Sequence, residues 1–65
     1  MKYPNIHVDL TDTAGDPYLV IGRVTVAMTQ AGCTSEQVKE FLDDVTSLDY
    51  YKVLQTCMEY VNAND

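Results

Sequence analysis

One histidine and one nearby carboxylate are the residues of this chain whose types and spacing suggest catalysis. His7 and Asp9 stand two residues apart in the opening stretch "YPNIHVDL". A histidine beside an aspartate can act as a general base, but the sequence places no nucleophile next to the pair. In an oligomer, the pair could be completed by another copy across a two-fold axis. The sequence therefore keeps an enzyme with His7 and Asp9 at a subunit interface as an alternative, and an exposed or interfacial histidine as the simpler interpretation.

The metal-binding residue types do not form a known pattern. Asp9, Asp12 and Asp16 cluster, but their spacing does not match the calcium loop D-x-[DN]-x-[DN]-G. Asp12 is better interpreted as a turn former and Asp16 as a helix cap. Cys33 and Cys57 cannot form a closed zinc site with a single histidine in one chain, and we interpret them as reduced thiols. We expect no metal site and no cofactor.

Length and charge limit the classes of function. The chain has 65 residues, ten of them acidic and four basic, for a net charge of −6. This length predicts one domain over residues 1–65 with a small core, of a size that often depends on oligomerisation. Four basic residues are too few to bind a run of phosphates or an anionic membrane. The opening "MKYPNIHVDL" lacks the apolar region of a signal peptide, and no apolar run approaches ~20 residues. We expect a cytoplasmic protein that binds neither nucleic acid nor membrane.

The first element that positions His7 and Asp9 is a strand. Ile6, Val8 and Leu10 alternate with polar residues, which predicts a half-buried strand over residues 5–11. The following "TDTAGD" is rich in turn formers. The polar face of this strand carries Asn5, His7 and Asp9.

The next segment, "DPYLVIGRVTVAMTQAG", is ambiguous. Its many β-branched residues favour a second strand, which would form a hairpin with the first. Asp16 followed by Pro17 instead matches an N-cap with proline at the first helical position, and Gly32 is a suitable C-terminal stop. The apolar residues also recur at helical spacing. We therefore predict a helix over residues 17–31.

Two further helices are expected. Thr34 begins an S/T-x-x-E/Q capping box, which predicts a helix that ends near Thr46. Ser47 or Asp49 caps a third helix over residues 50–62, whose apolar residues occupy several sides. The polar tail "NAND" is expected to be frayed.

These elements predict an α+β fold that is mostly helical, with one N-terminal strand followed by three short helices. In this β-α-α-α order the strand has no partner in its own chain, so both of its edges are unpaired. Antiparallel pairing with the same strand of another copy would satisfy it. We therefore expect a homodimer or a higher even-numbered oligomer, with an interface formed by Ile6, Val8 and Leu10.

Tyrosines are frequent in this chain and serve as candidate contacts. There are five tyrosines against one Phe and no Trp, and tyrosine is common at interfaces. Arg23 is notable because it lies in an otherwise apolar helix. The candidate binding residues are His7, Tyr18, Arg23, Tyr51 and Tyr60.

The order of these segments resembles a known group. "YPNIHVDL", a Gly-Asp turn, "VIGRVTVAMTQAG" and "TSLDYYKVLQTCMEYV" are similar to very small uncharacterised proteins of phages, prophages and bacterial genomes. That group often has Gly where this chain has Leu48, and basic residues at 24–26. The resemblance supports the helix over 17–31 and implies a bacterial host cell. It assigns no catalytic residue.

The expected function is non-enzymatic binding. The resemblance and the charge together favour a homo-oligomeric phage-type protein that blocks or sequesters a host component, as in counter-defence. The target would be a host protein or a small nucleotide-type ligand held between subunits. The alternatives are the small enzyme described above and a structural subunit of a larger assembly.

Overall fold

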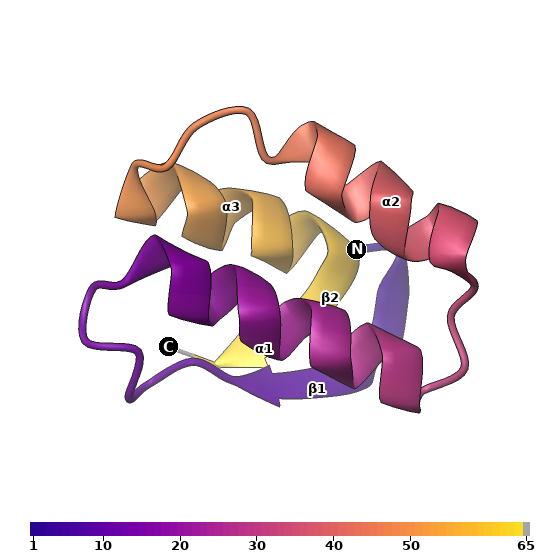
Figure 1. Cartoon of the computed structure of the whole chain (residues 1–65). Coiled ribbons are helices and arrows are strands. Elements are labelled where there is room, and N and C mark those ends of the chain that lie inside the picture. Colours follow the sequence, from indigo (N-terminus) through magenta and orange to yellow (C-terminus); the bar gives the residue numbers. More distant parts are fainter. Residues whose placement is uncertain (65) are drawn as a thin grey trace.

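The computed structural model describes residues 1–64 and shows a mixed α+β chain that is mostly helical (Figure 1). The elements follow one another in the order β-α-α-α-β. The bounds of these elements are β1 Tyr3–Asp9, α1 Pro17–Gln30, α2 Ser35–Asp44, α3 Tyr50–Tyr60 and β2 Val61–Asn64. Among residues 1–64, none of the helices has the length and apolar character that a membrane span requires.

The three helices form where the sequence predicts them, because side chains cap their N-termini. Asp16 and Asp49 accept hydrogen bonds from backbone N–H groups in the first turns of α1 and α3. The capping box of α2 is complete: the Thr34 hydroxyl accepts from the Gln37 N–H at 3.2 Å, and the Thr34 N–H donates to the Gln37 side chain at 2.7 Å. The prediction of a helix rather than a second strand after Pro17 is confirmed.

The prediction that the first strand has no partner in its own chain is wrong. The third helix ends at Tyr60 rather than at residue 62, and the segment predicted to be a frayed tail forms β2. This strand lies parallel to β1, which spans residues 3–9 rather than 5–11. An irregularity in β1 between Tyr3 and His7 interrupts the ladder. The paired positions are Tyr3 with Val61, His7 with Asn62, Val8 with Ala63, and Asp9 with Asn64.

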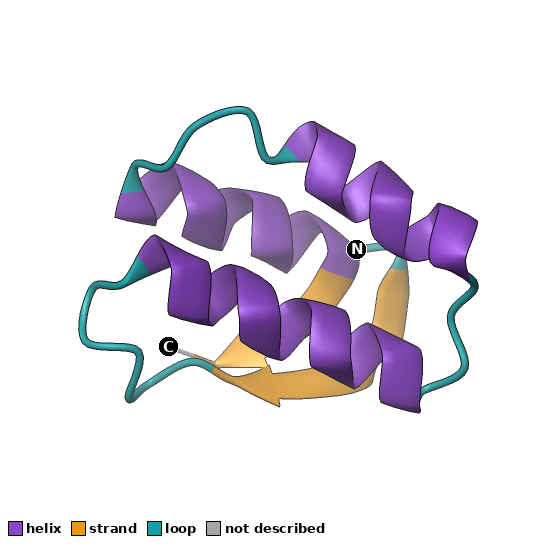
Figure 2. Cartoon of the chain, viewed as in Figure 1, coloured by secondary structure: helices purple, strands orange, loops and turns teal. Residues whose placement is uncertain are grey.

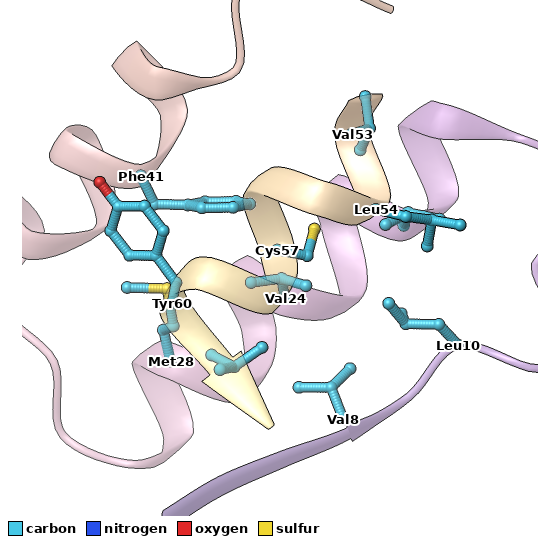
Figure 3. Close-up of a cluster of buried hydrophobic side chains, with 11 residues drawn as sticks. Val8, Leu10, Val24, Met28, Phe41, Val53, Leu54, Cys57 and Tyr60 are labelled. Carbon is cyan, nitrogen blue, oxygen red and sulfur yellow. The ribbon is translucent and has the colours of Figure 1, made fainter. Parts of the chain in front are cut away.

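The helices cover one face of this two-stranded sheet (Figure 2). Val8 and Leu10 are buried and point toward Val24 of α1 and toward α3 (Figure 3). The apolar face of β1, expected to be covered by a second copy, is therefore covered within the subunit for Val8 and Leu10, while Ile6 is half-buried. The fully or nearly buried core residues are Val8, Leu10, Val20, Val24, Met28, Phe41, Val53, Leu54, Cys57, Tyr60 and Val61.

The turn after β1 is fixed to α3 by a buried hydroxyl. Thr13 is completely buried, and its hydroxyl donates to the Leu10 carbonyl at 2.9 Å. The Thr13 hydroxyl is also hydrogen-bonded to the Tyr50 hydroxyl, with 2.6 Å between the two oxygens. This short chain of hydrogen bonds holds the end of β1 in place and thereby positions Asp9.

Candidate functional site

The face of the sheet that the helices leave uncovered is polar. His7 and Asp9 project from it beside Asn62 and Asn64 of β2, as the pairing register requires. These four exposed residues and Val8 line an open groove of about 340 Å³. The structure thus places His7 and Asp9 together on one surface, as the alternation of the strand predicts.

The chemistry of this pair is limited. The Asp9 carboxylate accepts hydrogen bonds from the Thr11 hydroxyl at 2.6 Å and the Thr11 N–H at 3.0 Å. These bonds hold the pKa of Asp9 below its ordinary value, with a smaller contribution from the positive charge of Arg23. Asp9 is therefore a stable anion and a weak base. The groove lining contains no serine, threonine or cysteine that could act as a nucleophile.

The direction of the backbone at Asp9 identifies the open edge of β1. The Leu10 N–H donates to the Asn64 carbonyl of β2 at 2.7 Å. In a trans peptide the preceding carbonyl points the opposite way, so the Asp9 carbonyl points away from β2. Backbone groups alternate in direction along a strand, so His7 also points its N–H and C=O away from β2, whereas Val8 points its own toward β2. Within residues 1–64 no other strand pairs with this edge.

Arg23 shows which side of α1 lies at this open edge. Its guanidinium donates to the Asp9 carbonyl at 3.3 Å. It also forms a bidentate ion pair with the Asp12 carboxylate, with nitrogen–oxygen distances of 2.5 and 3.2 Å. The positive charge of Arg23 is therefore already neutralised within the subunit.

The same side of α1 carries an apolar surface, which we call the α1 flank. Leu19 is 40% exposed and Val26 is 55% exposed, and Tyr18 at the start of the helix is 67% exposed. Gly22 lies between them and has no atom near the position of a missing Cβ. The helix contains no carboxylate, although the chain carries a net charge of −6. The flank forms an open groove of about 380 Å³ lined by Tyr18, Leu19, Gly22, Arg23, Val26, Ala27 and Gln30.

The other candidate tyrosines lie elsewhere. Tyr51 is 76% exposed on α3 and packs edge-on against Tyr50 at 5.8 Å between ring centroids. Tyr60 has a buried ring, in edge contact with Phe41 at 5.2 Å, and its hydroxyl donates to the Asp44 carboxylate on α2. Burial, followed by this carboxylate, raises the pKa of Tyr60 to about 12. Tyr60 therefore joins α3 to α2 and offers no free surface to a ligand.

A third groove, of about 550 Å³, lies between β1 and the α1–α2 connection. Two of its polar side chains, those of Lys2 and Gln37, already have partners. Lys2 forms an ion pair with Glu40 and lies 4.9 Å from the centre of the Tyr60 ring, and Gln37 is used in the capping box. Cys33, in the same groove, is a free thiol. The other free thiol, Cys57, is buried in the core, and this burial raises the pKa of Cys57 to about 11.

Within residues 1–64, no group of three or more His, Cys, Asp and Glu side chains could hold a metal ion. Of the five candidate binding residues, the structure brings Tyr18 and Arg23 into one groove and leaves His7, Tyr51 and Tyr60 apart from it. The sequence analysis did not identify Leu19 and Val26. Their signal is a helix whose apolar residues occupy every side and whose sequence contains no acid.

The chain was compared with protein-family models, with curated proteins and with solved structures, and none of these comparisons gave a match.

Proposed function

We propose that this chain is a non-enzymatic binding protein that acts as a homo-oligomer and blocks or sequesters a host component. The observation that carries the proposal is the open edge of β1 lying beside the exposed α1 flank. An unpaired edge and an exposed apolar helix face, placed together in a strongly acidic protein, form a surface suited to another polypeptide.

The first partner for this surface is a second copy of the chain. Antiparallel pairing of two β1 edges about a two-fold axis would give a four-stranded sheet in the order β2-β1-β1-β2. The backbone groups of His7 and Asp9 would form the new ladder, in which the Asp9 carbonyl would exchange its hydrogen bond from the Arg23 guanidinium for one from the partner strand. The two α1 flanks lie on the same side as the edges, so Leu19 and Val26 would be covered in the same step.

The target of the assembled protein is better matched by a protein than by a nucleotide. A nucleotide site needs a free cation or open backbone donors. Arg23, the one cation of the α1 flank, is paired with Asp12. The exposed Tyr51 and the acidic surface suit a basic protein partner. The resemblance to phage and prophage proteins supports a bacterial cell as the setting and counter-defence as the role.

Sedimentation of matched proline variants tests the assembly. His7→Pro removes an N–H from the open edge and leaves the internal ladder intact, so it should give a folded monomer. Val8→Pro removes an N–H that faces β2, so it should unfold the subunit itself. The two outcomes are separated by analytical ultracentrifugation together with circular dichroism.

Charge variants provide the second arm. Val26→Asp on the α1 flank should weaken association, whereas Leu48→Asp adds the same charge at a 50% exposed apolar residue outside the flank and should not. A wild-type protein that sediments as a folded monomer at micromolar concentration contradicts the proposed assembly. Pull-down from a host lysate with the wild type and with a Tyr51→Ala variant then tests the binding of a protein target.

A further inference from the structure

The open edge of β1 carries one basic and one acidic side chain on the same exposed face. His7 and Asp9 both project from the uncovered side of the sheet, and their backbone groups both point away from β2. In an antiparallel pair, residues whose backbone groups face the partner lie directly opposite each other in hydrogen-bonded pairs. A second copy therefore places its own His7 and Asp9 against these two side chains.

Three registers bring the regular part of the two edges together. An axis at His7 sets the two histidines opposite each other, and an axis at Asp9 sets two carboxylates opposite each other. An axis at Val8 instead sets His7 of each copy opposite Asp9 of the other. Like charges directly opposite destabilise a pair of strands, while opposite charges stabilise it.

We propose that the second copy pairs with β1 in the register centred on Val8, and that two symmetric His7–Asp9 contacts make the association stronger at acidic pH. The inference rests on the proposed assembly and specifies its register and regulation. It also gives a structural use to the pair of residues that sequence analysis singled out for catalysis.

The groups around His7 give the pH dependence a simple origin. Among the described residues, the groove that holds His7 is lined by one other titratable side chain, Asp9, and by Asn62 and Asn64, which are neutral. The hydrogen bonds from Thr11 keep Asp9 ionised at mildly acidic pH. A histidine gains its positive charge as the pH falls below neutrality. Pairing with Asp9 favours that charged form, so association is strengthened at low pH and the gain is lost as the pH rises.

A cross-linking experiment distinguishes the registers. His7→Cys and Asp9→Cys are prepared as separate proteins, each carrying Cys33→Ser so that no exposed native thiol competes. Opposed residues of a hydrogen-bonded pair have Cα atoms about 5.5 Å apart, within disulfide range. The register centred on Val8 predicts a disulfide dimer only when the two proteins are mixed. A dimer from His7→Cys alone, or from Asp9→Cys alone, overturns this register and leaves the proposed assembly in place.

The pH dependence is measured on the intact chain by sedimentation between pH 5.5 and 8. Lower pH also reduces the repulsion between two acidic subunits, so the wild type is compared with His7→Gln, which retains every carboxylate. As the pH is lowered from 8 to 5.5, the dissociation constant of the wild type should decrease more than that of His7→Gln. The difference between the two decreases should be roughly 2- to 10-fold. Equal changes in the two proteins overturn the His7–Asp9 contact. A monomer at every pH, with no cross-link, overturns the proposed assembly as well.

Discussion

The side chain of Tyr60 combines a buried aromatic ring with a hydrogen-bonded hydroxyl. Its ring is buried against Phe41, while its hydroxyl reaches the Asp44 carboxylate and the backbone carbonyl of Glu40 at 3.3 Å. Lys2 covers the outer side of the ring. One side chain thus holds α2, α3 and the N-terminal segment together, and this explains why a residue expected to bind a ligand serves the fold instead.

Removal of this hydroxyl should lower stability without changing the fold. Tyr60→Phe keeps the ring and loses the hydrogen bond to a carboxylate, at a cost of about 1 kcal/mol in the free energy of unfolding. Tyr51→Phe is the control, because Tyr51 is exposed and its hydroxyl makes no hydrogen bond within residues 1–64. Urea denaturation at pH 7 measures both variants. Equal stability of Tyr60→Phe and the wild type would contradict a structural role for the hydroxyl.

The same side chain gives an alkaline dependence with a defined sign. The pKa of Tyr60 is about 12 in the folded chain, above the ordinary value of 10. The folded state therefore holds the phenolic proton more tightly than the unfolded state does. The associated stability is complete below pH 10 and is lost as the pH rises through 12. Between these values, the melting temperature of the wild type should fall more steeply than that of Tyr60→Phe.

Among the elements, the helices could be predicted because their signals are local. Asp16, Thr34 and Asp49 are each followed by residues that complete a cap, and the structure contains all three caps. The choice of helix over strand after Pro17 succeeded because the cap and the helical spacing agreed against β-propensity. Single-residue cap signals therefore outweighed the composition of the whole segment.

Strand β2 could not be predicted in the same way, because its stabilisation is not local. Asparagine is a poor strand former, and the partner strand lies at the other end of the chain. The available signal was weak: Val61 and Ala63 alternate with Asn62 and Asn64, so that one side faces the core and the other faces solvent. Which edge of β1 stays open follows from this pairing, and it was out of reach for the same reason.

The direction of the β2 backbone can be tested with two adjacent prolines. The Asn64 carbonyl faces β1, so by alternation the N–H of Asn62 also faces β1 and that of Ala63 faces away. Asn62→Pro should therefore destabilise the chain more than Ala63→Pro, by about 1 kcal/mol for the lost ladder bond. Chemical denaturation gives the difference. The reverse order would show that the N–H of Ala63, and not that of Asn62, faces β1.

At the scale of the whole molecule, one layer of helices lies on a sheet of two strands (Figure 2). The core is formed between these layers, and the outer face of the sheet is polar and exposed. A domain of this size buries only roughly 60% of its unfolded surface, so its stability is marginal when it is alone. Covering the open edge and the α1 flank adds burial that the single chain cannot supply.

Folding and association should therefore be linked. A partner that binds only the folded state raises the melting temperature, and for a self-associating chain that temperature depends on protein concentration. The wild type should melt at a higher temperature when its concentration is raised. The Val26→Asp variant should lose most of this dependence on concentration, because its new carboxylates would face each other across the two α1 flanks. Leu48→Asp should keep it. Added salt should strengthen the wild-type association, because it screens the repulsion between two subunits that each carry a charge of −6. Differential scanning calorimetry over a dilution series measures these effects. If sedimentation detects oligomers but the melting temperature does not change with concentration in the same range, association is not coupled to unfolding. The interface would then lie away from β1.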